Sequence, residues 1–230
     1  MSSASIRARV RAEMIEEIKA IARRHLAADG ANLSLRAVAR DMGMVSSALY
    51  RYFANRDDLL TALIVDAYNT IGDAVEAADA RVTNRDDLRG RWLAATHAVR
   101  EWALANPAEY ALIFGSPVPG YAAPQLTADA AVRVPGTLVR IIADGAGTGR
   151  LPTPRDGPRL PPAVREDLVR IRDTTFPGLP EALLARGMVA WIHLFGAVSF
   201  ELFGHLNNVI EAREEFFEHQ MRLMADLIGI

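Results

Sequence analysis

A short polar and aromatic segment, residues 45–56, carries the side chains best suited to chemistry in this 230-residue chain. Hydroxyl, phenol and guanidinium groups follow one another there, and such groups hydrogen-bond to phosphate oxygens and to base edges in DNA grooves. Leu49 and Phe53 have the spacing of a buried helix face. The side chains that this spacing turns outward are Ser46, Ser47, Tyr50, Arg51 and Tyr52. The pattern predicts a surface that contacts nucleic acid.

Two short helices joined by a tight turn are needed to present this segment. Ser34 is a suitable N-cap for a first helix, and Gly43 supplies the backbone freedom that ends it. One apolar face is formed by Leu35, Val38, Ala39 and Met42. A second helix is expected over about residues 45–52. Spacing alone leaves two alternatives open, a helix-turn-helix that reads DNA and an ordinary helical hairpin.

The order of residues separates these alternatives, because residues 11–60 resemble the DNA-binding domain of the TetR family of bacterial transcriptional repressors. The resemblance rests on an amphipathic helix closed by Gly30, the run LSLRAVARDMGM and the run ALYRYFANRDDLL. In that family the second helix crosses the phosphates and the third enters the major groove. The resemblance therefore implies DNA contacts from Ser34, Arg36, Ser46, Ser47, Tyr50, Tyr52 and Arg56.

Two positions depart from the family pattern. Val45 and Ala48 stand where a polar residue and a hydroxyl are frequent, so direct contacts from them would be apolar, for example with a thymine methyl. We expect few bidentate base contacts and a larger share of shape readout and phosphate anchoring.

The whole chain is predicted to be all-α. A three-helix, helix-turn-helix DNA-binding domain is expected over residues 1–55, and a larger helical effector-binding and dimerisation domain over residues 56–230. Capping by the repeated Asn-Arg-Asp-Asp run predicts helices that begin near Asn55 and Asn84. The expected helices of the second domain cover about 56–81, 86–104, 108–114 and 125–143, the last interrupted by Pro135, and others begin near 163, after 180 and near 210. Residues 145–162 are rich in glycine and proline and predict a mobile surface loop.

The last two predicted helices have more apolar surface than one subunit needs. Residues 181–206 are apolar or small on nearly every side, and the final helix carries two apolar stripes. We expect a four-helix interface with two helices from each subunit of a homodimer. The residues expected there are Phe195, Gly196, Ser199, Phe203, Phe217, Met221 and Met224. The alternative is that both helices lie inside the core of one subunit.

The second half of the chain resembles the C-terminal regulatory domain of the TetR subgroup named for a Trp-His-Gly signature. The resemblance rests on residues 106–124 and 191–206, with Trp191 and Gly196 at the signature positions, although Phe195 replaces the signature histidine. In proteins of this kind aromatic side chains surround a ligand cavity. The resemblance implies an effector site that includes Trp92, His97, Tyr110, Phe114, Tyr121, Trp191 and His193. The alternative for each of them is an ordinary core position.

Composition and charge limit the function classes. Residues 1–60 hold ten Lys and Arg against seven Asp and Glu, a balance of +3, whereas residues 61–230 hold sixteen against twenty-one, a balance of -5. The positive charge therefore lies with the predicted DNA-reading helices. There is no cysteine, the five histidines lack the spacing of a metal site, and no serine elbow or phosphate-binding loop is present. These observations argue against an enzyme and against any metal or cofactor.

We also expect no signal peptide and no apolar stretch long enough to span a membrane, which places the protein in the cytoplasm. The sequence thus predicts a homodimeric repressor that binds a palindromic DNA operator and is released by a small apolar or amphipathic effector. Two alternatives remain at this point. One is a DNA-binding activator or architectural protein without an effector, and the other is a helical ligand-binding or partner-binding protein that does not bind DNA.

Overall fold

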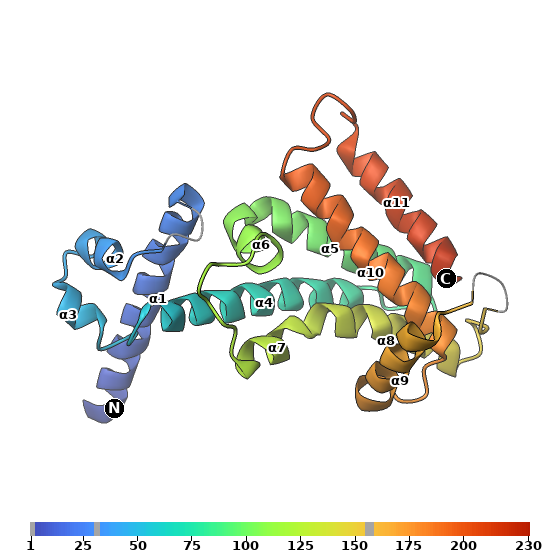
Figure 1. Ribbon diagram of the computed structural model, residues 1–230, viewed down its shortest axis with the longest axis horizontal. Helices are drawn as coiled ribbons and strands as arrows, with labels where there is room; N and C mark the ends of the chain where they lie inside the picture. Colours follow the sequence, from blue (N-terminus) through green and yellow to red (C-terminus); the bar gives the residue numbers. More distant parts are fainter. Residues whose placement is uncertain (1–2, 30–32, 155–158) are drawn as a thin grey trace. The chain divides into compact units, whose positions relative to one another are not determined.

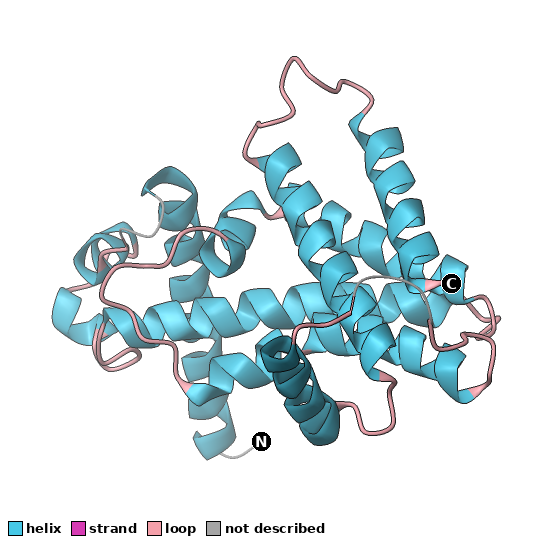
Figure 2. Ribbon diagram, turned by 45° about the vertical axis from the view of Figure 1, so that its right-hand side comes forward, coloured by secondary structure: helices cyan, strands magenta, loops and turns pink. Residues whose placement is uncertain are grey.

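The structure is a computed structural model that describes residues 3–29, 33–154 and 159–230. These residues form helices joined by turns and loops, and Figure 2 shows no strand among them. The all-α prediction is confirmed. The chain divides into two compact units: unit 1 comprises residues 1–70 and 106–131, and unit 2 comprises residues 71–105 and 132–230. This division differs from the boundary predicted after Asn55, because α4 (Arg56–Arg81) contributes to both units.

Unit 1 contains the long helix α1 and several short helices around a small core. Besides the first part of α4, its helices are α1 (Ser3–Asp29), α2 (Leu35–Asp41), α3 (Ser46–Leu49), α6 (Pro107–Phe114) and α7 (Gln125–Ala131) (Figure 1). Ile18, Val38, Leu49 and Leu60 are completely buried at its centre. The predicted second reading helix is shorter than expected, since regular helix ends at Leu49 and residues 50–52 continue as turns. Gly30, expected to close the first helix, lies outside the described residues.

Local hydrogen bonds explain where the reading helices begin and end. The Ser34 hydroxyl accepts a hydrogen bond from the Ala37 amide at 3.4 Å at the start of α2, and Gly43 has φ +66° in the turn that follows. The Asn55 side chain accepts a hydrogen bond from the Asp58 amide at 2.8 Å at the start of α4. These are the roles predicted for the three residues.

A distant part of the chain completes unit 1. Val118, in the loop after α6, is buried in the same core as α1 to α3. The Tyr121 hydroxyl lies 2.9 Å from that of Thr61, and the Tyr68 hydroxyl donates a hydrogen bond to the Ile113 carbonyl at 3.3 Å. Residues 106–131 are therefore structural members of the unit that carries α3.

Unit 2 is a bundle of longer helices. Besides the second part of α4, it contains α5 (Leu88–Ala105), α8 (Arg133–Gly147), α9 (Pro162–Thr175), α10 (Glu181–Leu202) and α11 (Arg213–Ile228). Helix α10 packs against α5, α8, α9 and α11. Trp92, Ile141, Leu194 and Phe217 lie in the core. The second Asn-Arg-Asp-Asp run does not act as the first does, because it is Asp87, not Asn84, whose side chain accepts the cap hydrogen bond, from the Gly90 amide at 2.8 Å.

Two expectations for the middle of the chain need correction. The helix expected over 125–143 is two helices that break at Val132, and Pro135 lies in the first turn of α8, where its missing N–H is tolerated. Residues 145–147, predicted as loop, belong to α8. Gly145 is buried against Leu88, and a Cβ atom there would come within 2.5 Å of that side chain. The glycine thus permits close packing of α8 rather than ending it. Of the predicted loop, residues 155–158 lie outside the described part of the chain.

Candidate nucleic-acid interface

Helix α3 and the turn after it present the side chains predicted to contact DNA. Leu49 and Phe53 anchor the element in the core, which turns Ser47, Tyr50 and Arg51 to solvent, with Ser46 and Tyr52 half-buried. Tyr50 is 46% exposed. The structure therefore brings the five predicted residues together on one short element. Their contacts with DNA stay predictions.

The start of α3 presents an apolar group. Val45 is the N-cap, makes no side-chain cap hydrogen bond and is 70% exposed. The methyl groups of Val45 are therefore mostly open to solvent and available to a partner. This agrees with the expectation of apolar contact at the start of the reading helix.

The arginines around α3 differ in whether they interact with other groups of the protein. Arg36 on α2 and Arg51 after α3 are exposed, and among the described residues neither is paired with a carboxylate. Arg56 is partly engaged, because its Nε donates a hydrogen bond to the Leu33 carbonyl at 3.2 Å and Asp57 lies 3.6 Å from its Nη1. Arg56 thus links the start of α4 to the segment before α2. Ser34 is exposed at the cap of α2.

One residue beside this surface was missed by sequence reasoning. Arg11 of α1 donates a hydrogen bond from Nη2 to the Arg51 carbonyl at 3.1 Å, and its guanidinium carbon lies 5.1 Å from the centre of the Tyr52 ring. The only available signal was the run of alternating arginines at positions 7, 9 and 11, which has no obvious partner in the sequence.

The predicted effector residues are divided between the units. In unit 1, Tyr110 is completely buried and its ring centre lies 5.1 Å from that of Phe114, which also contacts Tyr68 edge-on. Tyr121 makes the hydrogen bond with Thr61 described above. These three residues are therefore part of the packing of unit 1.

In unit 2 the predicted effector residues lie in different surroundings. Trp92 is completely buried and its Nε1 donates a hydrogen bond to the Met221 carbonyl at 3.0 Å, so it is a core residue. His97 packs edge-on against Phe217 at 5.4 Å. Trp191 contacts Phe195 at 6.0 Å. The Trp191 Nε1 and the His193 Nε2 are buried and have no hydrogen-bond partner within the described residues.

A hollow of about 380 Å³ lies between α10 and α11. It has an apolar lining with two polar side chains, and the residues that form it are Ile192, His193, Gly196, Ala197, Phe200, Leu206, Phe216 and Gln220. Gly196 is exposed, and a Cβ atom added to it would meet nothing within 4 Å.

The predicted interface residues on α11 need correction. Phe217 is 2% exposed and Met221 is completely buried, so they pack inside the subunit and are not available to a partner. Met224, Phe195 and Ser199 are half-buried. The exposed apolar side chains on these helices are Val189, Ile192, Phe200, Phe203, Leu223 and Leu227.

Helix α10 is the one helix among the described residues that has the length and composition of a membrane span. The helix has 22 residues, and an 18-residue window within it has mean hydropathy 1.5, with 33% of that window buried. By length and composition alone it could cross a membrane. One such helix is weak evidence, because packed helices of soluble proteins have the same composition. Its apolar character therefore needs another explanation.

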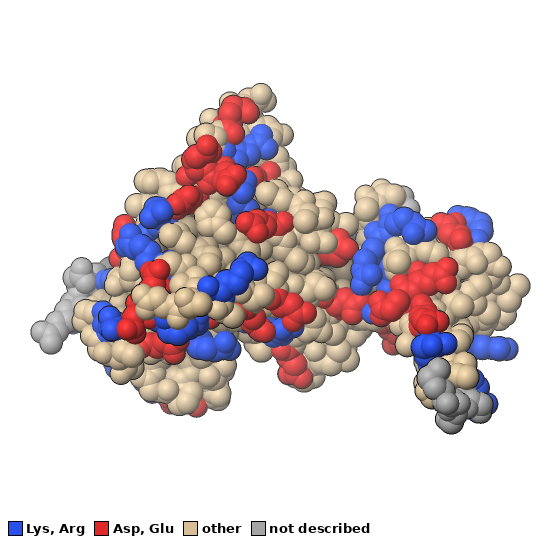
Figure 3. Space-filling view, turned by 180° about the vertical axis from the view of Figure 1, so that it is seen from behind, with Lys and Arg blue, Asp and Glu red and all other residues tan. Residues whose placement is uncertain are grey.

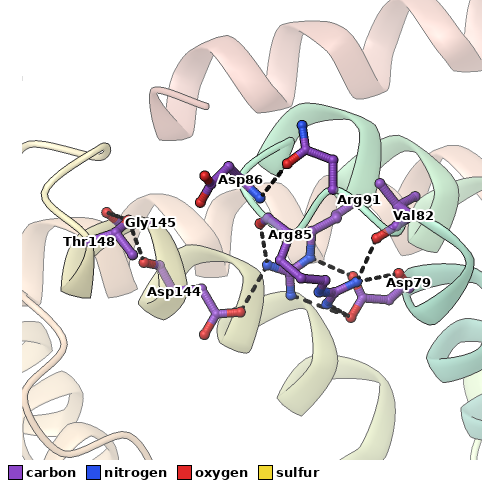
Figure 4. A network of polar contacts seen from close by, with 9 residues as sticks. Asp79, Val82, Arg85, Asp86, Arg91, Asp144, Gly145 and Thr148 are labelled. Atoms are coloured by element: carbon purple, nitrogen blue, oxygen red, sulfur yellow. Dashed lines mark hydrogen bonds and ion pairs between the residues drawn. The ribbon is translucent and has the colours of Figure 1, made fainter.

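Buried arginines tie the helices of unit 2 together. Arg91 of α5 is completely buried, donates a hydrogen bond from Nε to Asp79 of α4 at 2.7 Å and pairs with Asp144 of α8 at 2.9 Å (Figure 4). Arg85 donates a second hydrogen bond to Asp79 at 2.6 Å. Burial by itself would raise the pKa of Asp79, but the hydrogen bonds and charges of Arg91 and Arg85 together hold that pKa below its usual value.

No group of three or more metal-binding side chains is found in the part of the chain that the structure describes. An all-helical fold with a helix-turn-helix of exposed hydroxyl, phenol and guanidinium groups defines a class of DNA-binding regulator. Comparison with known proteins gives the family. A model described as bacterial regulatory proteins, tetR family, matches residues 18–63, and one described as tetracyclin repressor-like, C-terminal domain, matches residues 92–224.

Individual relatives match over nearly the whole chain. The HTH-type transcriptional regulators Rv1816 of Mycobacterium tuberculosis and Mb1846 of Mycobacterium bovis are each 40% identical over 227 residues, 94% of this chain and 93% of theirs. The crystal structure of the regulatory protein SCO4313 is 36% identical, with TM-score 0.79, and the match covers 97% of this chain and 98% of that one. The chain belongs to the TetR family of transcriptional regulators, which are DNA-binding proteins and not enzymes. The family resemblance inferred from residues 11–60 is confirmed.

Proposed function

We propose that this regulator is a ligand-responsive repressor that binds a palindromic operator as a cytoplasmic homodimer. The observation that carries the DNA-binding part is the surface of α2, α3 and the turn after α3. Tyr50 is exposed there, and no carboxylate of the described residues neutralises the charges of Arg36 and Arg51. Phosphate contacts supply most of the affinity of such proteins, and small hydroxyl groups such as that of Ser47 reach base edges.

The homodimer is supported by the outer faces of α10 and α11. Along one face of α10 and its C-cap, exposed residues recur at helical spacing: Val189, Ile192, Gly196, Phe200 and the C-cap Phe203. An apolar stripe of this length is unusual on the surface of a monomer and typical of a four-helix interface between two-fold-related subunits.

On α11 the exposed Leu223 and Leu227 continue the proposed interface, and Phe216 lies beside them in the hollow with Gly196. The proposed interface does not include Phe217 or Met221. It accounts for the apolar composition of α10 without a membrane, because a second subunit covers the apolar side chains that the first leaves exposed.

The palindromic operator follows from the proposed symmetry. A two-fold dimer presents two copies of α3, which enter successive major grooves when their separation is about 34–36 Å. An effector that favours another separation lowers operator affinity, and a tenfold loss requires a preference of only about 1.4 kcal/mol for the released state.

For the effector we propose an apolar or amphipathic small molecule. The residues proposed to contact it are His97, Trp191 and His193 of unit 2. Tyr110, Phe114 and Tyr121 are not included, because they pack within unit 1. The buried Nε atoms of Trp191 and His193, which lack partners in the described chain, are the polar groups that a ligand would satisfy. Trp92 is left out, since its indole already bonds Met221.

The DNA-binding proposal is tested by selection of duplexes from a random-sequence pool, followed by gel shift with the selected duplex. We expect a palindromic consensus. Tyr50→Ala should weaken binding to the selected duplex and to unrelated duplexes alike, because a phosphate contact carries no sequence information. If wild-type protein enriches no sequence, the proposal is wrong and the alternative of a ligand-binding or partner-binding protein is favoured. Repressor and activator are then separated by in vitro transcription from the selected site.

The homodimer is tested by Gly196→Leu and sedimentation. A Cβ atom added at this position meets nothing within 4 Å in the subunit, so the variant should fold as well as wild type and sediment as a monomer. Gly136→Leu on α8 is the matched control, because a Cβ atom there also meets nothing within 4 Å. An intact dimer of Gly196→Leu, with the same dissociation constant as the control, would place the interface elsewhere.

The effector proposal is tested with native mass spectrometry of the protein as purified, followed by titration of any released compound against the protein and selected duplex. Loss of the duplex on titration is the expected result. A bound compound that leaves duplex affinity unchanged would contradict effector control and leave the DNA-binding proposal standing.

A further inference from the structure

We propose that Arg11 of α1 is a positioning residue that holds Tyr52 in the orientation used to contact DNA phosphate. The inference rests on the proposed DNA contact of Tyr52. It assigns a role to a residue outside the helix-turn-helix, which lies 35 positions before Ser46, the first residue of α3.

The geometry around Tyr52 supports this role. One side of the Tyr52 side chain packs against the core that includes Leu49 and Phe53. The Arg11 guanidinium lies over its ring, 5.1 Å from the ring centre. The ring is thus held between apolar core and cation, and no described residue hydrogen-bonds its hydroxyl. The phenol is fixed in place while its polar end remains available.

A second contact fixes Arg11 itself. Its Nη2 donates a hydrogen bond to the Arg51 carbonyl at 3.1 Å, in the turn where α3 has ended and carbonyl groups have no partner within the helix. A cation at this end of a helix is favourable. Arg11 therefore contacts both the Arg51 backbone and the Tyr52 side chain in this turn.

This arrangement should raise affinity through preorganisation. A phenol that is free to rotate loses rotamer freedom when it binds a phosphate, whereas a ring that is already fixed does not. The alternative is that Arg11 itself binds a phosphate. Its observed contacts with Tyr52 and Arg51 favour the positioning role, because one guanidinium nitrogen is already committed to a carbonyl.

The test is a double-mutant cycle between Arg11→Gln and Tyr52→Phe, read as affinity for the duplex selected by the wild-type protein. Arg9→Gln is the matched control for loss of one positive charge, since Arg9 lies on the same exposed part of α1 and contacts Glu13. We expect Arg11→Gln to lower affinity about fivefold more than Arg9→Gln does in the wild-type background. In the Tyr52→Phe background the two substitutions should have equal effects.

Salt dependence separates the two roles of Arg11. If Arg11 binds phosphate directly, Arg11→Gln makes the slope of log affinity against log salt shallower by about 0.9 in both backgrounds. If Arg11 only positions Tyr52, Arg11→Gln should have the same salt slope as the Arg9→Gln control. Arg11→Lys, which keeps a cation over the ring, should recover part of the affinity. Additive effects of Arg11→Gln and Tyr52→Phe would overturn the inference. Failure of wild-type protein to select any duplex would instead overturn the proposed function.

Discussion

The arginines of unit 2 and those of the reading surface in unit 1 have opposite surroundings. In unit 2, Arg91 pairs with Asp79 and Asp144, and Arg100 forms a bidentate pair with Glu201 at 2.7 and 2.8 Å. Many basic side chains in Figure 3 likewise lie beside acidic ones. Arg51, in contrast, is exposed and has no carboxylate partner among the described residues. An arginine neutralised by carboxylates ties helices together, whereas an unpaired one remains available to phosphate. The location of unpaired cations is thus more informative about DNA than the net charge of -2.

The largest effect is expected where an ion pair is buried. Asp79→Ala leaves the enclosed Arg91 with one carboxylate instead of two, and we expect the free energy of unfolding to fall by about 3–5 kcal/mol. Urea denaturation at fixed protein concentration measures it. Asp86→Ala removes an exposed partner of Arg150 and should cost under about 1 kcal/mol. Equal losses for both variants would show that burial does not distinguish the two kinds of pair.

The same pair should appear in the pH dependence of stability. Because the pKa of Asp79 is lower in the folded protein than its ordinary value of 3.8, its ionised form stabilises the fold above that value. This contribution is lost as pH falls through the folded pKa. The difference in unfolding free energy between wild type and Asp79→Asn should be constant at neutral pH and shrink in acid below about pH 4. If the difference in unfolding free energy instead grows in acid, the pKa of Asp79 is raised in the folded protein and not lowered.

Unpaired arginines should affect DNA binding and not stability. Arg51→Gln is expected to make the salt slope of duplex affinity shallower by about 0.9 and to leave the unfolding free energy within about 0.5 kcal/mol of wild type. Arg222→Gln removes an exposed arginine paired with Glu218 and should leave the slope unchanged. Fluorescence anisotropy at several salt concentrations measures both. If Arg222→Gln makes the salt slope as shallow as Arg51→Gln does, paired and unpaired arginines do not differ in their effect on DNA binding.

The smallest effect is expected for Ser47→Ala, which keeps every charge. Loss of one hydroxyl at a base edge should change the preferred base at one operator position by at most about 1–3 kcal/mol of discrimination and leave the salt slope unchanged. Repeated selection from the random pool with the variant measures this preference. An unchanged consensus would show that Ser47 reads no base.

Sequence patterns predicted the positions of the helices well, because burial of one face imposes a period that can be read directly. Helix α4 has the predicted bounds, and Leu49 and Phe53 are buried as their spacing indicated. Helical periodicity could not show which face of α11 is buried, because this helix has two apolar stripes. Phe217 and Met221 had the better heptad spacing and were assigned to the interface, yet they pack in the core. With both stripes apolar, only the three-dimensional positions of neighbouring helices decide which one turns inward.

Contacts between distant residues were also beyond the sequence. Nothing local to Arg91 distinguishes it from exposed arginines, since its partners Asp79 and Asp144 meet it only when α4, α5 and α8 pack. For Arg11 the same holds. The candidate DNA residues were found because they share one short segment, and their supporting residue was missed because it lies on another helix.

The inclusion of residues 106–131 in unit 1 has a consequence for synthesis and for recombination between regulators. The reading helices leave the ribosome first, but Val118 and Tyr121, which complete their packing, are made only after the whole of α5 and α6. No single continuous stretch of this chain corresponds to the whole of unit 1. A chimera joined after α4 therefore brings a foreign residue to the place of Val118, and a functional exchange of DNA specificity must transfer both segments together.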